Sequence, residues 1–303
     1  MAMAKELKFA GSGVGEPWWI IGQITRRLLE PLGYEVEVLS ESGSTNNPRY
    51  VGGGKADFGA TVPQTLGWAV RGEHLFQGET FVPLRAVGRV HRPSWLTAAA
   101  RWELGFTSLK EIGESDYPIR LVTHDLKSIA SVVPNEVLKY YHLTKEEIEA
   151  KGGTVREIGG NDYRCTDFDV IIGNLYMGRS MVTRHWSAAT ELMNLRFLDL
   201  DDELLAKLTA DGHGTPGEVP FHFLRGVDRW VKALDRISDL LIYLPESTDE
   251  EFVYDLTKLY DTNRRKFFGQ AVQMAWDPAN VTNGDPLPLH AGAERYYREL
   301  GLL

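Results

Sequence analysis

In the first sixty residues, the spacing of the apolar positions changes between that of a β-strand and that of an α-helix. Residues 7–10 form a short apolar run typical of a strand, and residues 17–30 carry apolar side chains at the i, i+3, i+4 spacing of an amphipathic helix. Apolar and acidic residues alternate over 34–38, which predicts a half-buried strand, and residues 56–61 predict a third strand. With a short helical piece before the third strand, this order of elements predicts a parallel α/β unit.

The α/β pattern then starts again in a second lobe. Strands are predicted over 82–100 with a break at Pro93, and again over 119–123, 155–158 and 168–173, with a helix over 127–141. Residues 199–303 are predicted to be mostly helical, including one long amphipathic helix over 250–270. We therefore expect an α/β protein of two lobes, with residues 1–99 and 199–303 in the first lobe and 100–198 in the second.

Two loops of small residues follow predicted strands of the first lobe. The loop at 11–15 contains three glycines, and Pro17 suits the first position of the helix that follows. Backbone N–H groups of such a loop and of a helix start attract an anion. The second loop, at 42–48, is SGSTNNP. Because ligands of parallel α/β sheets bind beyond the carboxyl ends of the strands, both loops are candidates for one site.

Composition and charge argue against several kinds of function. The net charge of −9 argues against general nucleic-acid binding, and no apolar run approaches the ~20 residues of a membrane helix. The single cysteine, Cys165, and eight histidines without HxH or HExxH spacing predict no metal site. A GxSxG motif is absent and Glu16 occupies the third glycine position of a dinucleotide fingerprint, so we expect no enzyme and no cofactor.

Five stretches resemble one known family, the TAXI-type solute-binding proteins of TRAP transporters. Residues 12–22, SGVGEPWWIIG, are similar in register to the family pattern GGTGGTYYPVG. Ser42, Gly43, Ser44 and Asn47 match its second loop, and residues 54–60, GKADFGA, match the element after it. The ending, PLPLHAGAERYYRELGLL, is the most specific match, and residues 219–226, VPFHFLRG, are a looser one.

The resemblance implies a periplasmic-binding-protein type 2 fold with a ligand cleft between the lobes. It further implies a periplasmic receptor that closes on a small organic anion and delivers it to TRAP membrane permease subunits, without inserting into the membrane itself. The start of the chain, MAMAKELKF, lacks the apolar region of a signal peptide, so the periplasmic location follows from the resemblance alone. Two tryptophans replace the paired tyrosines of the family, which favours a carboxylate with an aromatic or apolar body.

Candidate ligand-binding residues come from the ends of predicted strands in both lobes. They are Gly13, Val14, Gly15, Trp18, Trp19, Ser44, Thr45, Asn47, Thr61, Thr123, His124, Arg164 and Asn174. A carboxylate is often bound by an arginine fork, for which the candidates are Arg49, Arg89, Arg92 and Arg164. Ser44 and Asn47 could instead cap a helix, and both tryptophans could belong to the core.

Two other functions stay open at this point. An enzyme acting on a small carboxylate could use the same two-lobed scaffold, because the partners of a catalytic triad need not be close in sequence. The second alternative is a ligand sensor that has no permease as its partner. His290, in the ending, is expected to have a structural role and to hold the C-terminal segment against the first lobe.

Overall fold

The chain forms two α/β units, each with its own β-sheet. The computed structural model describes residues 5–41, 43–123, 131–158, 164–178, 181–270 and 272–303. Unit 1 comprises Met1–Arg92 and Ser238–Leu303, and unit 2 comprises Pro93–Ile237. The predicted α/β class with two lobes is therefore confirmed.

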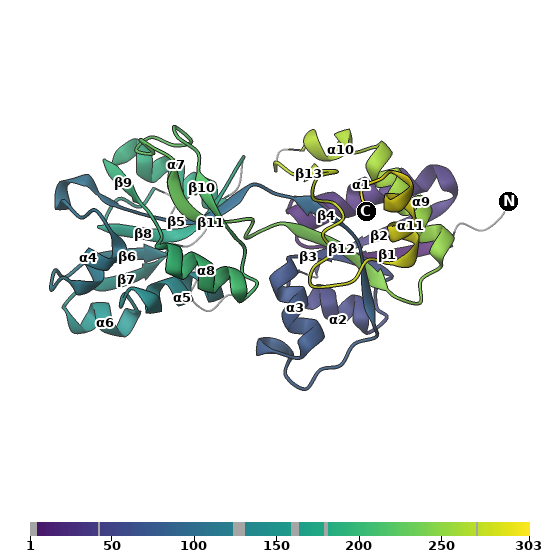
Figure 1. Cartoon of the computed structure of the whole chain (residues 1–303), viewed down its shortest axis with the longest axis horizontal. Coiled ribbons are helices and arrows are strands. Elements are labelled where there is room, and N and C mark those ends of the chain that lie inside the picture. Colours follow the sequence, from purple (N-terminus) through teal and green to yellow (C-terminus); the bar gives the residue numbers. More distant parts are fainter. Residues whose placement is uncertain (1–4, 42, 124–130, 159–163, 179–180, 271) are drawn as a thin grey trace. The chain divides into compact units, whose positions relative to one another are not determined.

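Unit 1 is built on a six-stranded sheet in the order β13-β4-β12-β3-β1-β2 (Figure 1). The strands are β1 (Lys5–Ala10), β2 (Tyr34–Leu39), β3 (Phe58–Thr61), β4 (Leu84–His91), β12 (Leu240–Pro245) and β13 (Ala275–Trp276). Strand β1 pairs in parallel with both β2 and β3, as the sequence predicts, while β12 runs antiparallel between β3 and β4. The carboxyl ends of β1, β2 and β3 therefore lie at one edge of the sheet.

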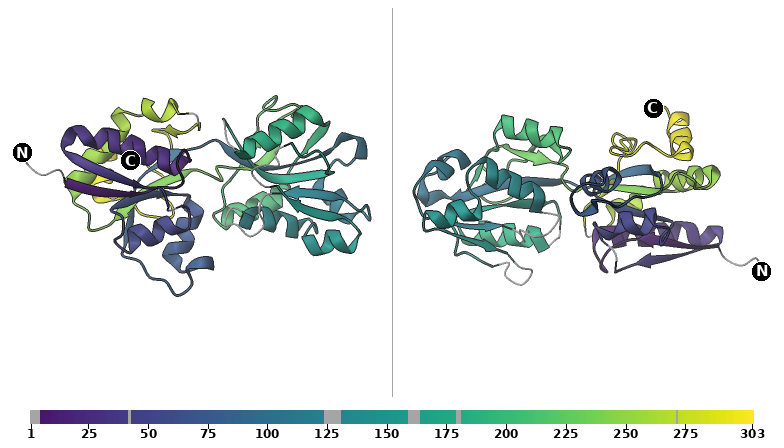
Figure 2. Two further views of the ribbon diagram at one scale, coloured as in Figure 1. Left: turned by 180° about the vertical axis from the view of Figure 1, so that it is seen from behind. Right: turned by 90° about the horizontal axis from the view of Figure 1, so that it is seen from below.

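Helices cover both faces of this sheet (Figures 1 and 2). One face packs against α1 (Pro17–Leu29), α9 (Glu250–Thr262), α10 (Arg265–Phe268) and α11 (Ala291–Glu299) in the larger apolar core. The other face packs against α2 (Asn46–Gly52) and α3 (Pro63–Arg71). Short 3-10 turns follow α1 at Glu30–Leu32 and α3 at His74–Phe76. The buried stripe of α1 matches its predicted amphipathic pattern.

His290 holds the start of the C-terminal helix against β4 and the end of β12. Its Nδ1 accepts from the N–H of Gly292 (3.2 Å), which caps α11, and its Nε2 donates to the carbonyl oxygen of Glu246 (3.1 Å). Its backbone N–H donates to the carbonyl oxygen of Ala86 (2.8 Å). The structural role predicted for this histidine is confirmed.

Unit 2 contains a seven-stranded sheet with the path β10-β11-β5-β8-β6-β7, to which β9 is added beside β5. The strands are β5 (Ser94–Arg101), β6 (Arg120–Thr123), β7 (Thr154–Glu157), β8 (Val170–Tyr176), β9 (Leu195–Leu198), β10 (Thr215–Val219) and β11 (Val231–Asp235). Strand β6 is parallel to β7 and β8, whereas β5 is antiparallel to β8, β9 and β11.

Two cores cover the faces of the unit 2 sheet. Helix α7 (Met181–Leu192) contributes to one of them, and α4 (Leu109–Glu114), α5 (Val132–Tyr140), α6 (Lys145–Ala150) and α8 (Asp202–Ala210) contribute to the other (Figures 1 and 2). A 3-10 turn, Trp102–Leu104, follows β5. No helix within the described ranges is long and apolar enough to cross a membrane.

Both unit boundaries differ from those expected. They lie at Arg92/Pro93 and Ile237/Ser238, whereas the sequence predicted 99/100 and 198/199. The reason is strand pairing: β5 forms the middle of the unit 2 sheet, and β10 and β11 extend that sheet instead of returning to unit 1. The prediction of a mostly helical remainder is also wrong, since β10, β11 and β12 follow residue 199.

Asp239 joins the two points where the chain leaves and re-enters unit 1. Its carboxylate is fully buried and accepts from the N–H of Arg92 (3.0 Å), while Nδ1 of His91 lies 2.8 Å from the same oxygen. Arg89 approaches the other carboxylate oxygen at 3.8 Å. These contacts fix the end of β4 to the start of β12 within unit 1.

The long helix predicted over 250–270 is divided in two. Helix α9 ends at Thr262 and α10 begins at Arg265. Between them, the Asn263 side chain donates from Nδ2 to the carbonyl oxygen of Leu259 (3.0 Å) and to Thr262 Oγ1 (3.3 Å). An asparagine that bonds to nearby backbone favours a helix end, which explains the break.

Candidate functional site

The first loop lies between β1 and α1 at the carboxyl edge of the unit 1 sheet. Gly15 has φ +87°, a left-handed conformation that glycine adopts without a steric penalty, and the N–H of Glu16 donates to the carbonyl oxygen of Gly13 (3.0 Å). Gly13, Val14 and Gly15 are exposed, Val14 to 74 %. The tip of the loop is therefore exposed, and its binding of an anion stays a prediction.

Helix α1 begins immediately after this loop. Pro17 occupies its first turn, and Glu16 stands at the N-cap without a side-chain hydrogen bond to the helix. The Ser12 hydroxyl instead accepts from the N–H of Trp19 (3.3 Å). A thirteen-residue helix that starts at a glycine loop provides backbone donors and a partial positive charge, which together suit a carboxylate.

The two tryptophans at the start of α1 have different surroundings. Trp18 packs against the larger core, and its indole N–H is buried without a hydrogen-bond partner in the described part of the chain. Trp19 is half-buried and lies outside the apolar core clusters. On a helical wheel Trp18 falls on the buried stripe with Ile21 and Thr25, whereas Trp19 does not. Of the two, Trp19 is therefore the one whose side chain the core does not hold.

Asn47 ties the two loops to β3. Its Nδ2 donates to the carbonyl oxygens of Gly11 (2.8 Å) and Ala60 (2.6 Å), and its Oδ1 accepts from the N–H of Gly43 (2.9 Å). The side chain is fully buried. Contrary to the sequence-based expectation, Asn47 does not present a polar group to a ligand: it fixes the positions of the loops that do.

Side-chain hydroxyl groups continue this set of hydrogen bonds from the second loop toward β12. Thr61, fully buried at the end of β3, donates to the carbonyl oxygen of Ser44 (3.1 Å), and the Ser44 hydroxyl lies 3.2 Å from that of Thr65 in α3. Burial raises the pKa of Tyr243, and the Thr61 hydroxyl beside it opposes that rise. Thr61 thus supports the second loop, and Ser44 and Thr45 remain the half-buried residues at its surface.

Thr65 and Tyr243 were missed by reasoning from sequence. Thr65 sits in the first turn of a helix where no motif marks it, and Tyr243 belongs to the run LLIYLP, which predicts only a buried strand. Strand register explains the place of Tyr243 near Thr61, since Tyr243 pairs with Gly59 and Leu241 with Thr61 across β12 and β3.

In unit 2, Thr123 ends β6, whereas Asn174 lies within the neighbouring parallel strand β8, which continues to Tyr176 and not to residue 173 as predicted. The pairing of Val122 with Ile171 places both side chains on the same face of the sheet. The Thr123 hydroxyl is buried without a hydrogen-bond partner in the described ranges, and Asn174 Nδ2 donates to the Tyr176 hydroxyl (3.3 Å). His124 lies outside the described residues.

Arg164 lies at the opposite edge of the unit 2 sheet from Thr123 and Asn174. It precedes the amino end of β8, where it lines a surface hollow with Arg101 and Thr166. A strand of seven residues separates the two edges by roughly 20 Å. The expectation that Arg164 joins Asn174 in one site is therefore contradicted by the direction of β8.

The other candidate arginines have structural partners. Arg49 donates from Nε and Nη2 to both carboxylate oxygens of Glu79, whose hydrogen bonds raise the pKa of the arginine. Arg89 donates to the carbonyl oxygens of Asn283 (2.9 Å) and Asp285 (2.7 Å). Arg92 is buried beside Asp239, to which its backbone N–H is bonded. Unit 1 therefore offers backbone and hydroxyl groups at the loop surface.

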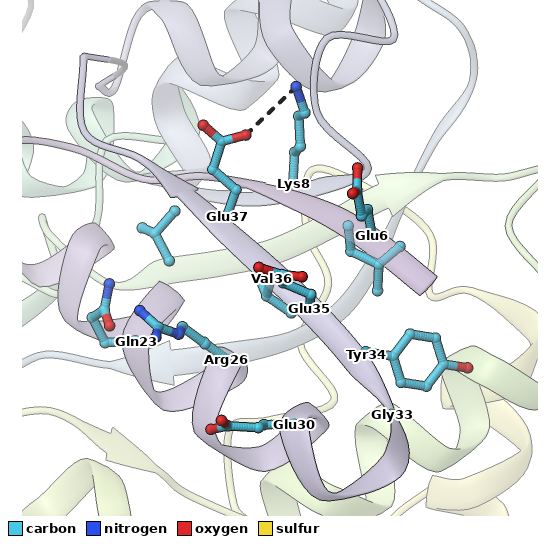
Figure 3. Close-up of a pocket in the computed structure, with 12 residues that line it drawn as sticks. Glu6, Lys8, Gln23, Arg26, Glu30, Gly33, Tyr34, Glu35, Val36 and Glu37 are labelled. Carbon is cyan, nitrogen blue, oxygen red and sulfur yellow. Dashed lines mark ion pairs between the residues drawn. The ribbon is translucent and has the colours of Figure 1, made fainter. Parts of the chain in front are cut away.

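One hollow of unit 1 lies along the edge strand β2, and its lining contains no residue of the two loops. It measures about 720 Å³. Figure 3 shows Lys8 and Glu37 pointing toward one another in an ion pair (3.5 Å), with Gln23 and Arg26 on α1 and Glu30 in the turn after it at the other side of the strand. Four glutamates face two basic residues across its lining: Glu6, Glu30, Glu35 and Glu37 against Lys8 and Arg26. This excess of negative charge disfavours an organic anion.

Metal ligands do not gather in the described part of the chain, where no group of three or more His, Cys, Asp or Glu side chains is placed to hold an ion. Cys165 is partly buried and unpaired.

Part of the chain matches a known protein family. Residues 187–301 match the model of the NMT1-like family, which is less than half of the chain. The matched segment runs from α7 to the C-terminal helix and so includes parts of both units.

Solved structures with similar folds include three bacterial proteins. The glycine betaine/L-proline-binding protein ProX of Borrelia burgdorferi is 13 % identical, with 84 % of this chain and 82 % of that chain covered and a TM-score of 0.48. Lipoprotein Tp32 of Treponema pallidum is 9 % identical, with 90 % and 99 % covered and a TM-score of 0.46. The periplasmic aliphatic sulphonate binding protein SsuA of Escherichia coli is 10 % identical, with 86 % and 71 % covered and a TM-score of 0.40.

Proposed function

We propose that this chain is a solute receptor that binds a small organic anion and releases it unchanged to a membrane transporter. The observation that carries the proposal is the pair of loops at the carboxyl ends of β1 and β2, fixed to each other and to β3 by Asn47. A site of this kind suits a receptor, because donors held in place before binding lose little entropy when the ligand arrives.

The ligand class follows from the groups at the loop surface. Exposed backbone at Gly13 and Gly15 and the start of α1 favour a carboxylate, by about 0.3–1 kcal/mol at an exposed helix end and up to ~2 kcal/mol when partly buried. Trp19 adds a flat apolar face beside these donors. We therefore propose an arylcarboxylate or a branched apolar acid in preference to a small amino acid.

The transporter class follows from the sequence resemblance. The TAXI-like motifs support delivery to a TRAP-type permease in the periplasm. With such a role, the receptor closes on its ligand, and Thr123 and Asn174 are the candidate ligand-binding residues of unit 2.

The ligand can be sought directly. Native mass spectrometry of the purified protein, followed by denaturation, should release a small organic acid of unchanged mass. A panel of candidate carboxylates then separates receptor from enzyme, because a receptor returns each bound compound unaltered while an enzyme converts it.

Gly15 offers a matched test of the site itself. Gly15 and Gly33 both have positive φ (+87° and +83°), and a Cβ added at either meets nothing within 4 Å. Gly15→Val and Gly33→Val should therefore lower stability by similar amounts, while only Gly15→Val abolishes binding of the identified acid in calorimetry. Equal affinity for the two variants would refute the assignment of the first loop.

A further inference from the structure

A second surface, in unit 2, combines exposed apolar side chains with arginines. Two adjoining hollows of about 320 and 490 Å³ share Met193 and Asn194 in their linings. Trp102 and Leu192 border them and are 50 % and 55 % exposed. We refer to it as the Trp102 surface, comprising Arg101, Trp102, Glu103, Arg164, Leu192, Asn194, Arg196, Arg225 and Asp228.

The centre of the Trp102 surface is held rigidly by Asn194. Its carbonyl oxygen accepts from the N–H of Trp102 (2.9 Å), its Oδ1 accepts from Arg225 (2.6 Å), and its Nδ2 donates to Glu103 (3.1 Å). The guanidinium of Arg196 stacks over the Trp102 ring at 4.0 Å. The backbone of Trp102 is therefore anchored and its exposed indole is stacked against Arg196, which lowers the entropic cost of using it to bind a partner.

Arginine charge on this surface exceeds the acidic charge. Three arginines line the hollows (Arg101, Arg164 and Arg225) and Arg196 stacks on Trp102 beside them, against the acidic lining residues Glu103 and Asp228 and the buried Asp169, which lies 3.9 Å from Arg101. Arg225 donates to the carbonyl oxygens of Thr190 and Glu191 and, at 3.5 Å, of Met193, and Arg196 donates to that of Phe106 (3.0 Å). Neutral oxygens satisfy these donors without cancelling their charge.

The local positive charge stands out because the chain as a whole carries −9. Aromatic residues and arginine are the types most enriched at the centres of protein interfaces, and a rigid Trp–Arg stack beside a leucine has that composition. An acidic partner is attracted to such a surface and repelled by most of the rest of the protein surface. This difference orients the partner as it approaches.

We propose that the Trp102 surface binds a protein partner through a carboxylate-rich segment carrying an apolar side chain. The carboxylates pair with the arginines around the hollows, and the apolar side chain packs on Trp102 and Leu192. This interaction is separate from the anion site of unit 1, since every residue of the surface belongs to unit 2.

The experiment is site-specific photocrosslinking in cells of the source organism. A benzoylphenylalanine at position 192 should give one dominant crosslinked protein, and its crosslinked peptide should contain more Asp and Glu than Lys and Arg. Position 230 is the matched control, because Trp230 is also exposed in unit 2, to 58 %, but lies outside both hollows. No crosslink at 192, an equal crosslink at 230 or a basic peptide would overturn the proposal.

A synthetic peptide with the sequence of the crosslinked segment then tests which residues of the Trp102 surface contribute to binding. Trp102→Ala and Arg196→Gln should each weaken binding at least tenfold in fluorescence anisotropy, and Trp230→Ala should leave it within twofold. Two other results would overturn the proposal: crosslinking to a second copy of this chain, or Trp102-dependent sedimentation with phosphatidylglycerol vesicles in place of peptide binding.

Discussion

Replacing Asn47 with alanine tests whether one buried side chain organises the candidate site. The change removes two hydrogen bonds to the carbonyl oxygens of Gly11 and Ala60 and one from the N–H of Gly43. Each is worth about 0.5–1.5 kcal/mol net, and a buried partner left unsatisfied costs about 1–3 kcal/mol. We expect Asn47→Ala to lower the free energy of unfolding of unit 1 by about 2–4 kcal/mol.

Asn47→Asp separates hydrogen bonding from packing. Aspartate keeps the shape and the acceptor for Gly43, but it places a carboxylate oxygen against two carbonyl oxygens. Burial and these carbonyls should raise the pKa of the new carboxyl in the folded protein. The protonated acid can donate one hydrogen bond, so stability should be regained as the pH falls through that raised pKa and lost as it rises.

Urea unfolding and hydrogen exchange measure these effects. A loss of 2–4 kcal/mol corresponds to a melting temperature lower by about 4–16 °C for a unit of this size. Exchange should accelerate in the peptides around Gly11 and Gly43 while unit 2 is unchanged. Affinity should fall by the same factor for every acid tested, because Asn47 positions the loops and does not contact the ligand.

Two results would refute this reasoning. One is a loss below about 1 kcal/mol for Asn47→Ala. The other is an Asn47→Asp variant with wild-type stability at neutral pH.

Three further changes have expected outcomes. Trp19→Tyr should reduce the preference for an arylcarboxylate over glutamate by up to about tenfold in calorimetry, whereas Trp18→Tyr should lower stability without changing that preference; an equal effect of both would contradict the finding that only Trp18 packs against the core cluster. Burial raises the pKa of Asp169, but hydrogen bonds from Arg120 outweigh this and hold it below 3.8, so its stabilisation is present above about pH 4 and lost as the pH falls through the folded-state pKa. Asp169→Asn should therefore destabilise unit 2 toward urea at neutral pH and less at about pH 3, and equal losses would contradict the pairing. The bound ligand should raise the melting temperature and reduce the radius of gyration in X-ray scattering; stabilisation without compaction would retain the receptor and exclude closure.

Hydrophobic periodicity was sufficient to predict the first half of unit 1. The alternation of Val36 and Val38 with two glutamates, and the apolar stripe of α1, correspond directly to a half-buried strand and a packed helix. Short strands such as β10 lack this signal: TPGEV is mostly exposed and contains a proline and a glycine. Its place in unit 2 depends on pairing with β11, which a local pattern does not encode.

The site residues likewise divide into those whose role depends on local conformation and those whose role depends on contacts with distant parts of the chain. Exposed loop glycines were predictable because their conformation is local, and Gly15 has the positive φ that only a glycine adopts readily. The role of Asn47 depends on three hydrogen-bond partners that lie 4 to 36 positions away in the sequence. Because the local sequence does not reveal these partners, a polar residue in a loop of small residues suggested contact with a ligand. Arg164 could have been excluded from the start, because a loop preceding a parallel strand lies at the amino edge of the sheet.

The position of β12 determines the order in which the chain can fold during synthesis. This strand separates β3 from β4 in the sheet, yet it is translated after all of unit 2. Unit 2 is continuous in sequence and has its complete set of strands once residue 235 has left the ribosome. Until β12 emerges, β3 keeps one unpaired edge and β4, whose other neighbour β13 is translated later still, keeps both, and such edges bind other chains. Nascent unit 1 is thus the part of this protein that depends on protection from aggregation.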